Sequence, residues 1–179
     1  MSLLIAEVPL FKNLSGEDIT IVMAQTQEKK FLKGETVFAE DDEADGLYIV
    51  MSGLFSVFVL SRASGMLRKP LAGLKPGMHV GELALIDGQP RSAGVECDAD
   101  GEMLYLPARA FLKLLSDRPN IAELVTNNLC GMISGSKSVS YSNEELKQRI
   151  KDRRIPPTAA NLKALCKLLR TSNYNYERA

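Results

Sequence analysis

The sequence predicts a mainly β domain with flanking helices, of the sandwich, jelly-roll or barrel class. Short runs of strand-like composition begin near residue 28 and continue to about residue 106. Glycine, proline and acidic stretches separate these runs at intervals of roughly 8–12 residues. Helical spacing of apolar residues occurs only before and after this region, which does not fit a doubly wound α/β fold.

The expected strands share a short length and an apolar or β-branched composition. They are residues 30–32, 36–39, 47–51, 54–60, 67–74, 93–98 and 103–106. Ser52-Gly53 and residues 98–101 are among the expected turns, because each combines glycine with small or acidic residues. The acidic stretch at residues 40–45 is interpreted as a local, solvated turn, and we assign it no function.

Helices are expected on both sides of the strands. Ser15 can cap a helix in which Asp18 takes the capping-box position. After Pro107 the helical period returns in two segments that are separated at residues 117–119. The second segment weakens from Gly131 onward, where glycines and serines favour other conformations, and both a hinge and a frayed end fit this composition.

Residues 136–179 differ from the rest of the chain in charge. The whole chain is neutral, but this part carries about +6 and the remainder about −6. Two short helices are expected here, one opened by a capping box at residues 142–145 and one after Pro156-Pro157. They are too short to form their own core, so we expect them to pack on the β domain, a second copy or a partner.

The composition limits the possible classes of protein. With 45% hydrophobic and 25% charged residues, the 179-residue chain is an ordinary globular domain with an appendage. No apolar run reaches the roughly 18 residues of a membrane span, and the first residues lack a basic signal-peptide start. Three separated cysteines fit reduced thiols better than disulfides or a zinc site. We therefore expect a cytoplasmic protein without membrane contact.

Residues 81–93 combine groups that suit a phosphate and a sugar. Gly81 lets the backbone approach a ligand, and the helix-forming residues after it would present free N–H groups to an anion. Arg91 can offer a charged, planar fork to a phosphate, and Ser92 adds a hydroxyl. Glu82 cannot help to bind an anion and would instead accept hydrogen bonds from a sugar hydroxyl. These groups indicate a nucleotide monophosphate, although an arbitrary Glu and Arg at this spacing more often form a surface ion pair.

The order of these residues resembles a known motif. Gly-Glu-Leu-Ala-Leu-Ile at 81–86 and Pro-Arg-Ser-Ala at 90–93 are similar to the phosphate-binding cassette of the cyclic-nucleotide-binding domains. These domains occur in bacterial cAMP receptor proteins, protein kinase A regulatory subunits and cyclic-nucleotide-gated channels. The resemblance extends over about residues 8–135, through segments 9–11, 34–38 and 44–53. It implies a jelly-roll-like β-roll with N-terminal and C-terminal α-helices.

The resemblance also implies roles for single residues. Glu82 would accept from the ribose 2′-hydroxyl, and Arg91 would pair with the cyclic phosphate. Ser92 favours cAMP over cGMP as the ligand, because members that prefer cGMP often have threonine after the arginine. No cofactor and no metal is implied. The residues expected to bind the nucleotide, which include backbone N–H donors, are Gly81, Glu82, Leu83, Ala84, Arg91, Ser92 and Ala93.

Two positions depart from the family pattern. Asp41-Asp42 stands where the family usually has glycine before the turn to its third strand. Val80 stands where the family often has an aromatic residue before the cassette glycine. We expect neither position to touch the phosphate chemistry.

The resulting hypothesis is a cyclic-nucleotide-binding regulatory domain over residues 1–135, which includes the N-terminal helix and the lid helices. A basic helical extension follows over residues 136–179. Ligand binding would close the helices after Pro107 over the nucleotide and signal to a second protomer, as in a homodimer, or to a protein effector. The alternative is a cyclic-nucleotide-responsive transcription regulator, or a fragment of one, that uses the extension on DNA. DNA is the less favoured partner, since the extension contains no recognisable DNA-binding domain.

Enzymatic hypotheses fit the sequence poorly. His79 is the only histidine, so a cupin-type metal site with several histidines cannot form, and we expect His79 to be structural. No serine stands in a convincing nucleophile elbow. The chain is therefore expected not to be an enzyme.

Overall fold

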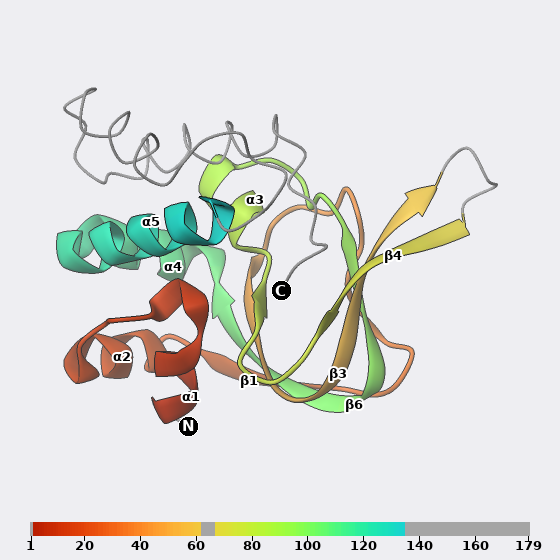
Figure 1. Cartoon of the computed structure of the whole chain (residues 1–179), viewed down its shortest axis with the longest axis horizontal. Helices are drawn as coiled ribbons and strands as arrows, with labels where there is room; N and C mark the ends of the chain where they lie inside the picture. The colour runs from red at the N-terminus through yellow and green to blue at the C-terminus, as the bar shows by residue number, and fades with distance from the viewer. Residues whose placement is uncertain (1, 62–66, 135–179) are drawn as a thin grey trace.

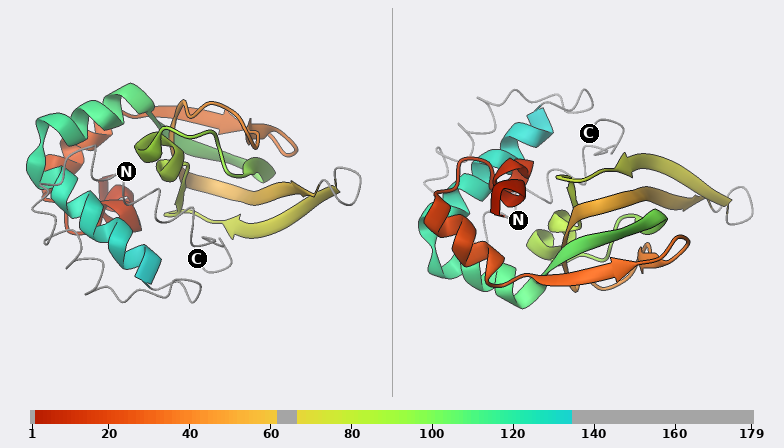
Figure 2. Two further views of the ribbon diagram at one scale, coloured as in Figure 1. Left: turned by 90° about the horizontal axis from the view of Figure 1, so that it is seen from above. Right: turned by 90° about the horizontal axis from the view of Figure 1, so that it is seen from below.

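The protein consists of a roll of antiparallel strands with helices packed at one end. The computed structural model describes residues 2–61 and 67–134. Figures 1 and 2 show most of the helices gathered on one side of the molecule, with the roll extending away from them. The mainly β fold with flanking helices that the sequence predicts is therefore confirmed.

The strands of the described residues form one antiparallel sheet. They are β1 (Gln27–Phe31), β2 (Thr36–Phe38), β3 (Gly46–Ser61), β4 (Leu67–Leu74), β5 (His79–Val80) and β6 (Gly94–Pro107). The order along the sheet is β1-β6-β3-β4, with β2 paired to β6 and β5 paired to β3. The sequence did not predict β5, because two residues are too few to show a period.

β3 and β6 run without interruption through two segments that were predicted to be turns. Ser52-Gly53 lies inside β3 and residues 98–101 lie inside β6, and the pairing register shifts several times where they meet. A Cβ on Gly53 or Gly101 would collide with the backbone of the opposite strand. These glycines therefore permit close backbone approach at bulges, and the prediction of two turns was wrong.

The helices frame the strands as expected, with one addition at the N-terminus. They are α1 (Ser2–Glu7), the 3-10 helix η1 (Pro9–Phe11), α2 (Gly16–Met23), α3 (Glu82–Asp87), α4 (Ala108–Asp117) and α5 (Pro119–Ser134). The predicted cap of α2 is confirmed: the Ser15 hydroxyl accepts from the Asp18 N–H at 3.1 Å, and its O–H donates to the Asp18 carboxylate at 2.7 Å. The two helices predicted after Pro107 are also confirmed, whereas α1 was not expected.

Alternate residues of β3 face two separate cores. Leu47 and Ile49 pack in the core that the strands share with the helices. Tyr48 and Val50 belong to the core inside the roll. This alternation follows from strand geometry, since successive side chains point to opposite faces. The roll thus has an apolar interior and an apolar outer face that the helices cover.

The predicted C-terminal extension falls on residues that the structure does not describe. α5 continues to Ser134, past Gly131, while the rest of the proposed hinge and both tail helices lie within residues 135–179. The domain boundary near residue 135 therefore stays a prediction. Within residues 2–61 and 67–134, no helix is long and apolar enough to cross a membrane.

Candidate functional site

A tight turn and a short helix form the cassette segment. β5 ends at Val80, Gly81 adopts a left-handed φ of 95°, and α3 begins at Glu82 as the sequence predicts. α3 is closed by Gly88, whose φ of 69° is also left-handed and typical of a glycine after a helix. A Cβ at position 81 would collide with the guanidinium of Arg91. Both the backbone conformation and the close approach of Arg91 therefore require glycine here.

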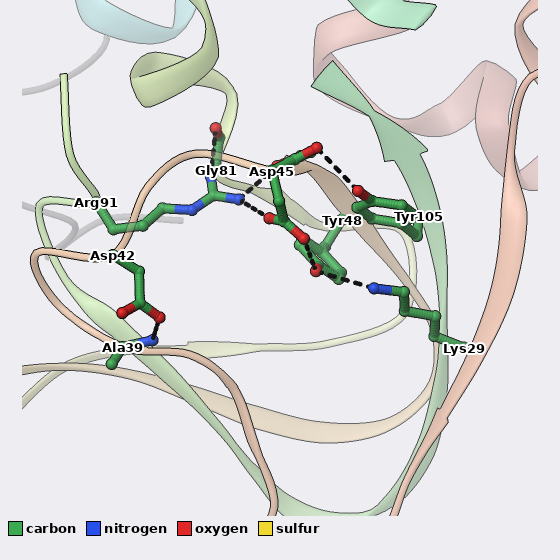
Figure 3. A network of polar contacts seen from close by, with 9 residues as sticks. Lys29, Ala39, Asp42, Asp45, Tyr48, Gly81, Arg91 and Tyr105 are labelled. Atoms are coloured by element: carbon green, nitrogen blue, oxygen red, sulfur yellow. Dashed lines mark hydrogen bonds and ion pairs between the residues drawn. The ribbon is translucent and has the colours of Figure 1, made fainter. Parts of the chain in front are cut away.

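Arg91 is held inside the protein by three oxygen atoms (Figure 3). Its Nη1 donates to the carbonyl of Gly81 at 2.9 Å, and its Nη2 donates to the Gly46 carbonyl and the Asp45 carboxylate, each at 2.7 Å. The guanidinium carbon also lies 4.1 Å from the centre of the Phe38 ring, as in a cation–π contact. Its Nε is buried and has no hydrogen-bond partner among the residues described. The Nε–H donor of this buried cation is thus unused.

Asp45 connects Arg91 to a cluster of aromatic side chains. The hydroxyl of Tyr48 donates to the second Asp45 carboxylate oxygen at 2.8 Å, and the hydroxyl of Tyr105 donates to the Asp45 carbonyl at 2.8 Å. Lys29 Nζ donates to the Tyr48 hydroxyl at 3.3 Å and lies 3.8 Å from the centre of the Tyr105 ring. Burial alone would raise the pKa of the Asp45 carboxyl, but hydrogen bonds from Tyr48 and Arg91 and the nearby positive charges lower it. Asp45 therefore stays ionised beside Arg91.

The acidic stretch at residues 40–45 has a role that the sequence did not reveal. Besides the Asp45 contact, the Asp41 N–H donates to the Arg91 carbonyl at 2.9 Å, and the Arg91 N–H donates to the Asp42 carbonyl at 2.8 Å. Asp41 adopts the left-handed φ of 70°, a conformation that aspartate tolerates better than most residues. Asp41 thus takes a backbone conformation that favours glycine, the residue that the family usually has here. Interpreting this stretch as a solvated turn was incomplete, because it holds the cassette arginine from both backbone and side chain.

A cavity inside the roll brings most of the predicted binding residues together. The free space in it is about 10 Å³, room for about one water molecule, so its wall must open to admit a larger ligand. Its walls are formed by Phe38, Val57, Val80, Gly81, Leu83, Ala84, Arg91, Ser92, Ala93 and Val95. Six of the seven residues predicted to bind the ligand line this cavity. Its wall is apolar apart from the cassette backbone, the guanidinium and one hydroxyl.

Glu82 is the predicted residue that does not line the cavity. Its side chain is 4% exposed, and its Oε2 lies 4.0 Å from Nε2 of His79, which is also 4% exposed. Neither atom has a hydrogen-bond partner in the described part of the chain. Burial lowers the pKa of His79, while the charge of Glu82 acts in the opposite direction. Leaving a buried carboxylate oxygen unpaired is unfavourable, so a donor brought to it would stabilise the protein.

The chain is similar to known proteins over the same region. Residues 28–118 match the family model described as cyclic nucleotide-binding domain. The Cyclic AMP receptor protein of Thermus thermophilus is 31% identical over 126 residues, which are 70% of this chain and 56% of that protein. The cAMP-dependent protein kinase regulatory subunit of Emericella nidulans is 30% identical over 115 residues, 64% of this chain and 27% of that protein. The chain therefore spans less than two thirds of the length of either relative.

A solved structure has the same architecture. The regulatory domain of Toxoplasma gondii PKA, crystallised with cAMP, has a TM-score of 0.63 and 25% identity to this chain, and the match covers 75% of this chain and 48% of that one. The family model extends from β1 into the residues after α4 and includes the whole cassette. This agreement confirms the predicted jelly-roll-like β-roll with flanking helices. The chain belongs to the family of cyclic nucleotide-binding domains.

Proposed function

We propose that this chain binds a cyclic nucleotide, with cAMP preferred, in the cavity inside the roll. The observation that carries the proposal is the position of Arg91. It is 2% exposed, lies on the cavity wall and has a buried Nε–H without a partner among the described residues. A buried cation with an unused donor suits one anionic phosphate, because charge-assisted hydrogen bonds are stronger than neutral ones.

The cassette backbone supplies the second part of the phosphate site. Leu83 and Ala84 belong to the first turn of α3 and line the cavity, and N–H groups in the first turn of a helix have no acceptor within the helix. Ser92 adds a hydroxyl on the same wall. Because Asp45 and two carbonyls fix the guanidinium, the charged group is oriented before the ligand arrives. Such preorganisation reduces the entropy lost on binding.

Glu82 supplies the sugar contact in this proposal. Its neighbours Gly81 and Leu83 both line the cavity, so in this proposal a small shift of α3 brings one carboxylate oxygen to the same wall. Its unpaired Oε2 shows that this carboxylate has acceptor capacity left. The ribose 2′-hydroxyl would donate to one oxygen of this carboxylate, while Arg91 holds the phosphate.

The signal would leave the site through the helical core. Leu83 and Leu85 of α3 pack in the same core as Phe111 of α4 and Val125 of α5. A nucleotide that displaces α3 therefore disturbs the packing of α4 and α5, since close-packed cores move between discrete arrangements. We propose that ligand binding shifts this population and so signals to a second protomer or a protein effector.

The relatives favour regulation over catalysis. The two named above are a receptor protein and a kinase regulatory subunit, and we propose that this chain likewise binds its ligand in the cytoplasm without converting it. The basic charge of residues 136–179 favours a second candidate, a transcription regulator that contacts DNA. DNA affinity that falls steeply with salt would support that candidate, and a flat salt titration would reject it.

The test is calorimetric titration of cAMP and cGMP into wild type, Arg91→Ala and Glu82→Ala, with Lys75→Ala as a surface control. Wild type and the control should bind cAMP more tightly than cGMP. Arg91→Ala should lose roughly 1.5–3 kcal/mol of binding free energy, about 10- to 150-fold in affinity, because a charge-assisted phosphate contact is gone. If wild type binds neither nucleotide, the proposed function is wrong while the fold is unaffected.

A further inference from the structure

His79 and Glu82 form a buried pair beside the cavity. His79 lies opposite Ile49 of β3, and cross-strand neighbours share a face of the sheet. Because Ile49 packs in the helical core, His79 lies on the face that the helices cover. The left-handed turn at Gly81 then brings the first residue of α3 against the imidazole, with Nε2 4.0 Å from Oε2 of Glu82.

The separation of these two atoms is longer than a hydrogen bond by about 1 Å. Both atoms are buried and both lack a hydrogen-bond partner among the described residues, which is unfavourable for each. An apolar side chain at position 79 would fill the same space without that cost. The imidazole is therefore better explained by a contact that it completes than by the packing it provides.

We propose that His79 is a positioning residue for Glu82: its Nε2–H donates to Oε2 in the nucleotide complex and leaves Oε1 to accept the ribose 2′-hydroxyl. This inference rests on the proposed function, because it assigns the ribose to Glu82. A small shift of α3 closes the gap, as hydrogen bonds in ligand-free sites often tighten on binding. In that complex the imidazole fixes which carboxylate oxygen faces the ribose.

The consequence is specific to one hydroxyl of the ligand. Glu82 would contact only the 2′-hydroxyl, so His79 contributes to the affinity for cAMP and contributes nothing to the affinity for 2′-deoxy-cAMP. A histidine that merely packs in the core would affect both nucleotides equally. The ratio of the two affinities therefore separates a positioning role from a structural one.

The test is titration of the full chain with cAMP and 2′-deoxy-cAMP, using wild type, His79→Leu and His79→Gln. Leucine fills the volume without a donor, and glutamine keeps an N–H donor at a similar distance along the side chain. His79→Leu should weaken cAMP binding about two- to tenfold and leave 2′-deoxy-cAMP binding unchanged. His79→Gln should restore most of the preference for cAMP.

Equal weakening of both nucleotides by His79→Leu, or an unchanged preference for cAMP, would overturn the inference while the proposed function stands. A wild type that binds both nucleotides equally would also overturn it, because Glu82 then does not read the ribose. A wild type that binds neither nucleotide overturns the proposed function and this inference with it.

A second measurement does not depend on whether the variants fold. His79 is the only histidine of the chain, so its imidazole nitrogens give an unambiguous signal in nitrogen NMR of the wild type. Adding cAMP should shift the Nε2 resonance to that of a hydrogen-bonded N–H and protect its proton from exchange. An Nε2 resonance that does not change on saturation with cAMP would contradict the role.

Discussion

The two ends of the cassette segment place their charged side chains in opposite circumstances. Arg91 is surrounded by three oxygen acceptors and an aromatic ring. Glu82 is equally buried, yet one of its carboxylate oxygens has no hydrogen-bond partner within the described residues. Arg91 thus has its hydrogen-bond partners within the fold, whereas one carboxylate oxygen of Glu82 still needs a donor. In our proposal the phosphate contact is prepared in advance and the sugar contact forms with the ligand.

This comparison predicts very different stabilities for variants of the two residues. Arg91→Ala should lower the free energy of unfolding by about 2–4 kcal/mol, because it removes three hydrogen bonds and leaves the half-exposed Asp45 without its cation. Glu82→Met keeps the length of the side chain and removes the unpaired oxygen, so it should change stability by less than about 1 kcal/mol. Chemical denaturation without nucleotide measures both. Equal losses would show that the two ends do not differ in this way.

A substitution at Gly81 tests whether the position of Arg91 depends on the turn beside it. Gly81→Ala should cost roughly 2–3 kcal/mol of stability and weaken cyclic-nucleotide binding, because the new methyl group is strained and displaces the guanidinium. Gly77→Ala is the matched control: its φ of 88° is just as left-handed, but the added Cβ meets open space. It should cost about 1 kcal/mol and leave binding unchanged. The two variants are compared by thermal unfolding and calorimetric titration.

If Gly77→Ala weakens binding as much as Gly81→Ala, backbone strain alone explains the effect. The contact between Gly81 and Arg91 would then have no special part in the site.

The buried pair of His79 and Glu82 predicts that the stability of the protein depends on pH. Burial lowers the pKa of His79 below its ordinary value of 6.5, so below that pH the unfolded chain binds a proton that the folded chain does not. The free energy of unfolding should therefore fall as the pH drops below 6.5, by at most about 1.4 kcal/mol per pH unit. The fall should end once the pH passes the pKa of the folded protein. His79→Gln should remove this component.

Denaturation curves of wild type and His79→Gln between pH 7.5 and the onset of acid unfolding measure the effect. Stability profiles that stay parallel over this range would mean that His79 does not titrate differently in the folded state.

The sequence predicted the binding segment better than it predicted the partners of that segment. The left-handed glycine, the short helix and the arginine of residues 81–93 form a local pattern, and six of the seven expected residues line one cavity. The carboxylate that binds Arg91, that of Asp45, could not be found from a local pattern. Asp45 is one of five acidic residues between positions 40 and 45, and only the pairing of distant strands shows which of them reaches the guanidinium.

Long-range pairing also explains the main error in the predicted fold. Glycine with serine or acidic neighbours favours a turn locally, but β3 and β6 pair along almost their whole length and carry these residues as bulges. Tertiary contacts overrode the local preference. The orientation of Glu82 is a similar case, because no spacing rule shows on which side of a short helix an unpaired carboxylate lies.

The most direct test of the account is a crystal structure of the chain with cAMP. We expect the cyclic phosphate within hydrogen-bond distance of the Arg91 guanidinium and the N–H groups at the start of α3, and the ribose 2′-hydroxyl on the Glu82 carboxylate. Nucleotide density outside the roll, or a phosphate that makes no contact with Arg91, would contradict the account.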